Sequence, residues 1–326
     1  MSQPTVAECP IHHGYEPFAQ KNPFPAYAAL RAEEPVRYDE RIGYWAVARY
    51  DDVKAVFDGW LTFSSENAQA PVRERGAEAK RIMDEGGFTA YSGLSARVPP
   101  EHTRIRKVVA RAFTPRRYKA LEPAIRANVV RQVQALLMRP GRAGDLVADL
   151  AYELPTVTIL TLIGADTAQV DTFKRWSDSR GAMTWGHLTD AEQIPHAHNL
   201  VAYWRECQRL VAEAHRTRPD NLVGDLVRAQ GAGDEITDHE IASVCYSLLF
   251  AGHETTTTLI ANALRELLAR DAAVGRNMLA KMQTRVAIEE VARLAPGLRL
   301  VDAGTIEFGD SLSVRIPVRV PVEWEA

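Results

Sequence analysis

Apolar residues that recur every three or four positions dominate the chain and predict helices along most of its length. The most apolar of these segments is 237–270, which begins with Thr237-Asp238-His239-Glu240, a pattern that fits a helix capping box. At 1.5 Å per residue, this central helix would be roughly 45–50 Å long. Further helices are predicted at 23–34, 51–57, 101–113, 118–137, 145–163, 166–179, 191–217, 222–230 and 278–294.

Alternating apolar and polar residues predict two small β regions. Segments 36–39 and 44–47 flank a polar turn and predict a hairpin, and the tail 298–324 alternates in the same way. Segment 69–97 is charged and dotted with glycine, which indicates a mobile loop with one helical piece. We therefore predict a mainly α fold with small β sheets, in which an N-terminal arm at 1–22 precedes one domain at 23–326.

Composition narrows the range of partners and compartments. The chain is 46% hydrophobic and 25% charged with a net charge of -3, so nucleic acid is not an expected partner. Its three cysteines, Cys9, Cys207 and Cys245, have no spacing typical of a zinc site or a disulfide framework, and no metal site is predicted. The N-terminus has no apolar signal core, and the run 241–251 is too short to span a bilayer. We expect a cytoplasmic protein without a membrane partner.

Ala251-Gly252-His253-Glu254-Thr255-Thr256 interrupts the central helix with residues that a buried helix tolerates poorly. A glycine costs about 1 kcal/mol relative to alanine, and a buried carboxylate needs a partner or a shifted pKa. Ala251, Gly252 and Thr255 share a face, where small side chains would let a flat ligand approach the backbone. Thr255 could donate a hydrogen bond to the Ala251 carbonyl, and Glu254 with Thr255 supplies the acid and alcohol of a proton relay. The alternative is a buried helix with a tolerated defect.

His102 and Arg106 form a second candidate site. They are four residues apart on a predicted helix, so both could donate hydrogen bonds to one carboxylate or phosphate. The alternative is a solvated basic face, because Arg104, Lys107 and Arg111 are also basic.

In this order and spacing, the two motifs resemble those of the cytochrome P-450 family of haem-thiolate monooxygenases. Segment 43–53 resembles the family's early hairpin and following helix, and 99–106 followed by 112–116 resembles its haem-facing helix. The resemblance covers about 16–270 and 275–324. It implies that His102 and Arg106 hold the haem propionates, that Ala251 and Gly252 line the oxygen side, and that Glu254 and Thr255 deliver protons.

By the same resemblance, the activity is hydroxylation or dealkylation of a small organic substrate with dioxygen. No reductase follows position 324, so a ferredoxin or reductase-type electron donor is expected as a partner. Loops at 69–98 and 180–198 would shape the substrate pocket. Phe88, Tyr91 and Trp185 would either line that pocket or pack in the core.

The sequence departs from the family where the haem ligand should lie. The family's Glu-x-x-Arg helix and its Phe-x-x-Gly-x-x-x-Cys-x-Gly loop are missing near 271–277, and the ligand cysteine would fall at Ala273 or Val274. Iron in this family is held by a cysteine thiolate. Glu290 to Arg293 spells Glu-x-x-Arg, but its context matches a later helix, so we interpret it as surface and interhelix charge.

These observations predict an internally truncated P450-type chain that is itself inactive. Cys207, Cys245 and His253 are expected to be packed in the interior, and the deletion should leave apolar surface and strand edges uncovered. The alternatives are a haem-free P450-like binding scaffold, a non-functional deletion product, or a helical protein with no site.

Overall fold

A computed structural model describes residues 22–91, 93–270, 279–302, 306–309 and 315–325. The predicted arm and the predicted junction at 271–277 lie outside these residues. The N-terminal elements are α1 (Phe24–Glu33), β1 (Val36–Asp39), β2 (Tyr44–Val47), α2 (Tyr50–Asp58) and α3 (Ala77–Glu85). The helical body follows as α4 (Glu101–Ala112), α5 (Pro115–Leu137), α6 (Leu154–Ile163), α7 (Val170–Trp185), α8 (Asp190–Thr217), α9 (Leu222–Gly231), α10 (Asp238–Arg270) and α11 (Leu279–Leu294).

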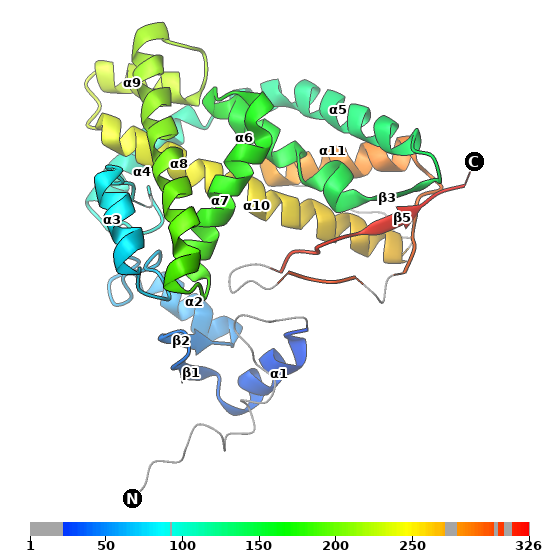
Figure 1. The fold of residues 1–326 in the computed structure, drawn as a ribbon, viewed down its shortest axis with the longest axis horizontal. Coiled ribbons are helices and arrows are strands. Elements are labelled where there is room, and N and C mark those ends of the chain that lie inside the picture. Colours follow the sequence, from blue (N-terminus) through cyan, green and yellow to red (C-terminus); the bar gives the residue numbers. More distant parts are fainter. Residues whose placement is uncertain (1–21, 92, 271–278, 303–305, 310–314, 326) are drawn as a thin grey trace, which may run out of the picture.

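The central helix α10 organises the body (Figure 1). It packs against α6, α8 and α11, and its predicted capping box is confirmed. The Thr237 amide donates to the Glu240 carboxylate at 2.8 Å, and the Glu240 amide donates to the Thr237 hydroxyl at 3.2 Å. The helix therefore begins where the sequence predicted.

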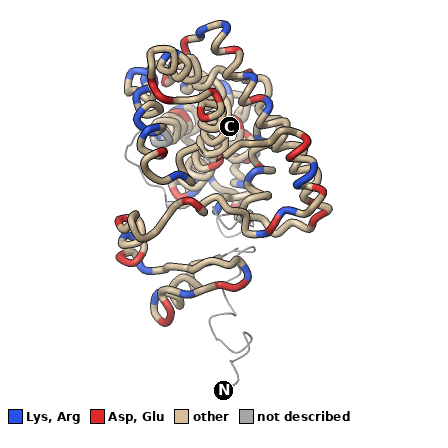
Figure 2. The backbone as a smooth tube through the Cα atoms, turned by 90° about the vertical axis from the view of Figure 1, so that its left-hand side faces the viewer, with Lys and Arg blue, Asp and Glu red and all other residues tan. Residues whose placement is uncertain are grey.

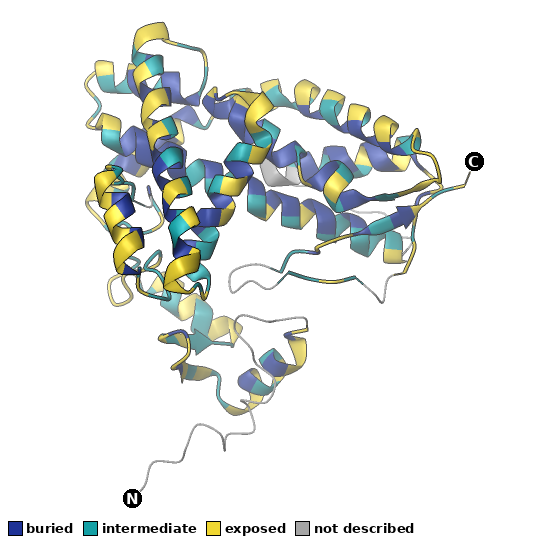
Figure 3. Cartoon of the chain, viewed as in Figure 1, coloured by how far each residue is buried: buried dark blue, intermediate teal, exposed yellow. Residues whose placement is uncertain are grey.

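Two apolar clusters surround different ends of α10. The first joins its N-terminal half to α3, α4, α6, α8 and α9, around the fully buried Tyr203 and Trp204. The second joins its C-terminal half to α5 and α11 and to the strands of the tail. Figure 3 shows these buried residues as a continuous layer along α10. Acidic and basic residues are interspersed over the outside of the molecule (Figure 2).

The predicted hairpin is confirmed, with β1 antiparallel to β2 from Val36 opposite Val47 to Asp39 opposite Tyr44. In the part of the chain that the structure describes, no third strand joins this pair. Together with α1 and α2 the hairpin forms a lobe at the lower edge of Figure 1. Most of the exposed large apolar side chains among the described residues belong to this lobe and the turn after it: Phe24, Val36, Tyr38, Trp45, Tyr50, Phe57, Trp60, Leu61 and Phe63.

The single helix predicted at 145–163 is wrong. The chain instead forms β3 (Ala143–Asp145), a π-helical turn at Val147–Ala151, and then α6. The Asp145 carboxylate accepts hydrogen bonds from the amides of Val147 at 3.0 Å and Val320 at 2.8 Å. This contact with a strand far along the chain holds Asp145 in the sheet, and helical periodicity cannot reveal it.

The tail is β in part. β5 (Pro321–Glu323) pairs antiparallel with both β3 and β4 (Arg299–Leu300), which gives a three-stranded sheet in the order β3-β5-β4. Phe308 and Pro317 form an isolated bridge. Elsewhere, α3 confirms the helical piece predicted within 69–97, and α7 continues to Trp185, six residues beyond the predicted end.

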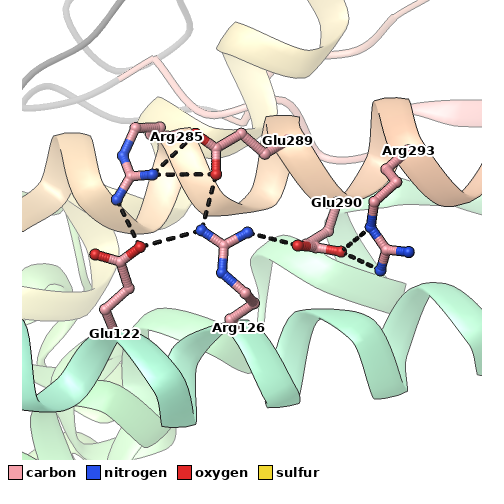
Figure 4. A network of polar contacts seen from close by, with 6 residues as sticks. All are labelled: Glu122, Arg126, Arg285, Glu289, Glu290 and Arg293. Atoms are coloured by element: carbon pink, nitrogen blue, oxygen red, sulfur yellow. Dashed lines mark hydrogen bonds and ion pairs between the residues drawn. The ribbon is translucent and has the colours of Figure 1, made fainter.

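An ion-pair network joins α5 to α11 (Figure 4). Arg126 of α5 contacts Glu290 at 2.5 Å, Glu289 at 2.8 Å and Glu122 at 3.1 Å. The buried Glu290 also contacts Arg293 at 2.5 Å. Glu290 and Arg293 are thus interhelix and surface charges, as the sequence context indicated.

Glu290→Gln should lower the free energy of unfolding by about 1–2 kcal/mol, because it removes a charged acceptor that two guanidinium groups share. The measurement is urea denaturation followed by circular dichroism. Glu289→Gln is the matched control: this carboxylate is 43% exposed, and its loss should cost less than about 1 kcal/mol. Equal losses in the two variants would contradict the expected role of burial.

Candidate functional site

The sequence motif on α10 places two small residues on an open face of the helix. Ala251 and Thr255 are exposed, and Leu259, one turn further on, is 40% exposed. The Thr255 hydroxyl donates to the Ala251 carbonyl at 2.7 Å, which confirms the hydrogen bond predicted from the sequence. A small flat ligand could therefore lie against this turn without meeting a large side chain.

Gly252 has a second structural reason to be small. A Cβ atom at this position would lie 3.0 Å from the Ile159 side chain of α6, closer than ordinary van der Waals contact. Gly252 therefore allows α6 and α10 to pack closely beside the open face.

Glu254 occupies a different environment from its neighbour Thr255. It lies in a largely buried group of charges with Lys174 and Asp178 of α7. Burial raises the pKa of Glu254, the negative charge of Asp178 raises it further, and Lys174 opposes the shift. Burial also lowers the pKa of Lys174 to about 8, and the Lys174 ammonium lies 4.0 Å from the centre of the Tyr152 ring. The acid of the predicted relay is thus coupled to α7, while the alcohol faces the open side.

His253 is packed in the interior, as predicted. It is 2% exposed, and its Nδ1 lies 2.7 Å from the Leu249 carbonyl, which it can reach as a donor. Burial and the nearby positive charge of Lys174 lower its pKa to about 3. His253 therefore stays neutral near pH 7.

His102 and Arg106 lie one turn apart on α4, half-buried and exposed respectively. Arg104 and Arg111, on the same helix, form ion pairs with Glu240 and Asp234. Within the described residues, no ion pair or hydrogen bond occupies the side chains of His102 and Arg106. The two predicted anion-binding groups are thus available to an external anion, and His102 also lines a pocket of about 780 Å³ beside α2.

A second pocket, of about 470 Å³, lies between α7, α10 and the segment that includes α3. Phe88, Tyr91 and Arg180 line it, in agreement with the prediction that the loops 69–98 and 180–198 shape a pocket. Trp185 instead packs against Phe250, with ring centroids 5.5 Å apart. The arginines of this pocket were missed in the sequence because they come from separate segments with no motif spacing.

Comparison with known proteins identifies the family. The Cytochrome P450 family model matches residues 149–286. Erythromycin C-12 hydroxylase from Saccharopolyspora erythraea is 33% identical over 298 residues, which are 90% of this chain and 70% of the hydroxylase. The chain belongs to the cytochrome P450 family. Cytochrome P450 monooxygenase PikC from Streptomyces venezuelae is also 33% identical, over 76% of this chain and 56% of PikC.

The fold is that of a P450. The structure of cytochrome P450 CREJ in complex with (4-ethylphenyl) dihydrogen phosphate superposes with a TM-score of 0.92 and 51% identity. That match covers 96% of this chain and 100% of the other. Haem is the cofactor of the family, and its members act on small organic substrates with a redox partner. Among the residues that the structure describes, no helix combines the length and apolarity needed to cross a bilayer.

The residues in place fit one half of a haem site. Ala251, Thr255, His102 and Arg106 are suited to the open face and the carboxylate end of the group. Cys207 and Cys245, however, are completely buried in the apolar core, and burial raises the pKa of both thiols, that of Cys245 to about 12. Neither is disposed to act as a thiolate ligand, and Cys9 lies outside the described residues.

His253→Gln should flatten the acid side of the stability profile. His253 gains a proton with a pKa near 6.5 when unfolded but only near 3 when folded, so stability is lost as pH falls below about 6.5. The loss should approach about 1.4 kcal/mol per pH unit, or about 2 kcal/mol at pH 5. Urea denaturation at pH 7 and pH 5 measures it. The exposed His198→Gln is the control and should keep the wild-type slope.

Proposed function

We propose that this chain retains the ligand-binding and oxygen-facing side of a P450 monooxygenase but is defective in oxygen activation, because the proximal cysteine loop is absent. The open face of α10 at Ala251 and Thr255 carries the proposal. The residues that would meet cofactor and substrate are on that face, while the cysteines among the described residues are buried elsewhere. Haem, when bound in this family, supplies the oxygen and redox chemistry.

Two further observations support an internal deletion. Alignments that cover 90% and 76% of this chain cover only 70% and 56% of the relatives. The lobe formed by α1, β1, β2 and α2 also exposes nine large apolar side chains, with exposed fractions from 47% for Val36 to 84% for Leu61. Monomeric proteins seldom leave such a surface uncovered, so a covering segment of the parent fold would account for it.

For the site residues, we assign His102 and Arg106 to the carboxylate end of haem and Ala251 and Gly252 to its open face. Thr255 would hold a proton at its hydroxyl beside that face, and Glu254 would exchange protons from the α7 side. The parent reaction would be hydroxylation or dealkylation of a small organic molecule. Since the CREJ structure contains (4-ethylphenyl) dihydrogen phosphate, aryl phosphates are the first ligands to test.

Purified protein titrated with haem should not give a stoichiometric complex whose reduced carbon-monoxide form shows a thiolate-type Soret band. The physical reason is that no accessible thiolate stands opposite the α10 face. Cys9→Ala, Cys207→Ala and Cys245→Ala provide the controls. A thiolate-type band in the wild type that disappears in one of these variants would overturn the proposal and identify the ligand.

Any residual haem association should depend on the anion-binding end of the site. Arg106→Ala is expected to weaken it about five- to tenfold, because a charge-assisted contact with a carboxylate is lost. His102→Ala should act in the same direction. Absorbance titration measures the affinity, and Lys107→Ala, an exposed cation beside Arg106, should leave it unchanged. Equal effects of Arg106→Ala and Lys107→Ala would refute the assignment.

A further inference from the structure

The 470 Å³ pocket between α7, α10 and segment 66–101 contains an unusual set of side chains for a pocket that receives small organic molecules. Three guanidinium groups line it, and three aromatic rings lie among them. The guanidinium groups belong to Arg75, Arg97 and Arg180, and the rings to Phe88, Tyr91 and Tyr246. Such a combination is suited to a ligand with an anionic end and an aromatic body.

Arg75 is the cation with the least compensation. Its side chain is half-buried, its Nε is buried without a hydrogen-bond partner, and no ion pair holds it among the described residues. By contrast, Arg73, two residues earlier, contacts Asp190 at 3.4 Å. A guanidinium group withdrawn from water without a counter-ion is costly, so an anionic ligand would stabilise it.

Arg97 has capacity left for a second acceptor. Its Nη1 contacts the Glu101 carboxylate at 2.6 Å, and its guanidinium carbon lies 3.7 Å from the centre of the Tyr91 ring. Its Nε is buried and has no partner. Glu101 is 62% exposed, so solvent screens its pairing with Arg97, and an anion in the pocket could compete with it.

Arg180 adds positive charge to the wall. It is 4% exposed, donates to the Tyr246 carbonyl at 2.8 Å and lies 4.3 Å from the centre of the Tyr246 ring. The acidic side chains that line the pocket are Glu66, which is exposed, and Glu101. Three cations therefore face two carboxylates, and the buried charges are all positive.

The aromatic wall lies close to the open face of α10. Phe88 and Tyr246 meet edge to face, with ring centroids 5.9 Å apart. Tyr246 precedes Ala251 by five residues, which is about 7–8 Å along a helix axis. A benzene ring with a substituent at each end is of comparable length, so one such molecule could reach from the arginines toward the turn that carries Ala251.

We propose that Arg75 and Arg97 form an anion-recognition subsite that selects aryl phosphate monoesters, with the ring held against Phe88 and Tyr246. The inference rests on the proposed retention of the ligand pocket and adds the residues that choose its ligand. The bidentate geometry of guanidinium groups favours phosphate oxygens over a neutral phenol hydroxyl.

The test is isothermal titration calorimetry of the full chain without haem, using 4-ethylphenyl phosphate, 4-ethylphenol and inorganic phosphate. The aryl phosphate should bind at least tenfold more tightly than either of the others. Arg75→Gln should weaken aryl phosphate binding at least tenfold and leave 4-ethylphenol unchanged, while Arg75→Lys should fall between. Glu101→Gln should strengthen aryl phosphate binding, because Arg97 loses its competing carboxylate.

Arg73→Gln is the matched control and should bind like the wild type, with circular dichroism establishing that each variant is folded. Equal affinity for the aryl phosphate and the phenol, or equal effects of Arg75→Gln and Arg73→Gln, would overturn the subsite alone. Failure of both aromatic ligands to bind would overturn the retained pocket as well. A thiolate-type haem spectrum would instead overturn the proposed defect and leave the subsite intact.

Discussion

The burial of α10 is the constraint on which the rest of the molecule depends. A helix of 33 residues needs partners along its length, and α6, α8 and α11 supply them on one side through two apolar clusters. The other side is open at Ala251, Thr255 and Leu259. Because the same helix carries core residues and site residues, the packing that stabilises the fold also fixes where the candidate site opens.

Polar residues on α10 show how closely stability and site are connected. Glu240 caps the start of the helix and also pairs with Arg104, so one carboxylate fixes both the beginning of α10 and its contact with α4. Further along, His253 stays neutral in the core while Glu254 shares a buried charge group with Lys174 and Asp178. A segment of three residues thus holds a packed base, a coupled acid and an exposed alcohol.

The arginines divide according to their partners. Those at α5 and α11 take part in a network that neutralises them fully, which is a structural use of charge (Figure 4). Arg106 on α4 and Arg75 in the pocket lack such partners among the described residues. Since a half-buried guanidinium group without a counter-ion is unfavourable, these positions are the ones where an external anion would contribute most to stability.

The sequence by itself determined the helices with strong periodicity, the hairpin, the capping box at Thr237 and the hydrogen bond from Thr255 to Ala251. All of these depend on residues within a few positions of one another, so local physics is sufficient. It also identified the family, because the motifs around His102 and Thr255 are contiguous. Only the tertiary structure decided that Asp145 belongs to a sheet, since its partner Val320 lies 175 positions away. The same holds for the separation of Glu254 from Thr255 and for the convergence of Arg75, Arg97 and Arg180, because burial and charge coupling arise only when distant segments pack together.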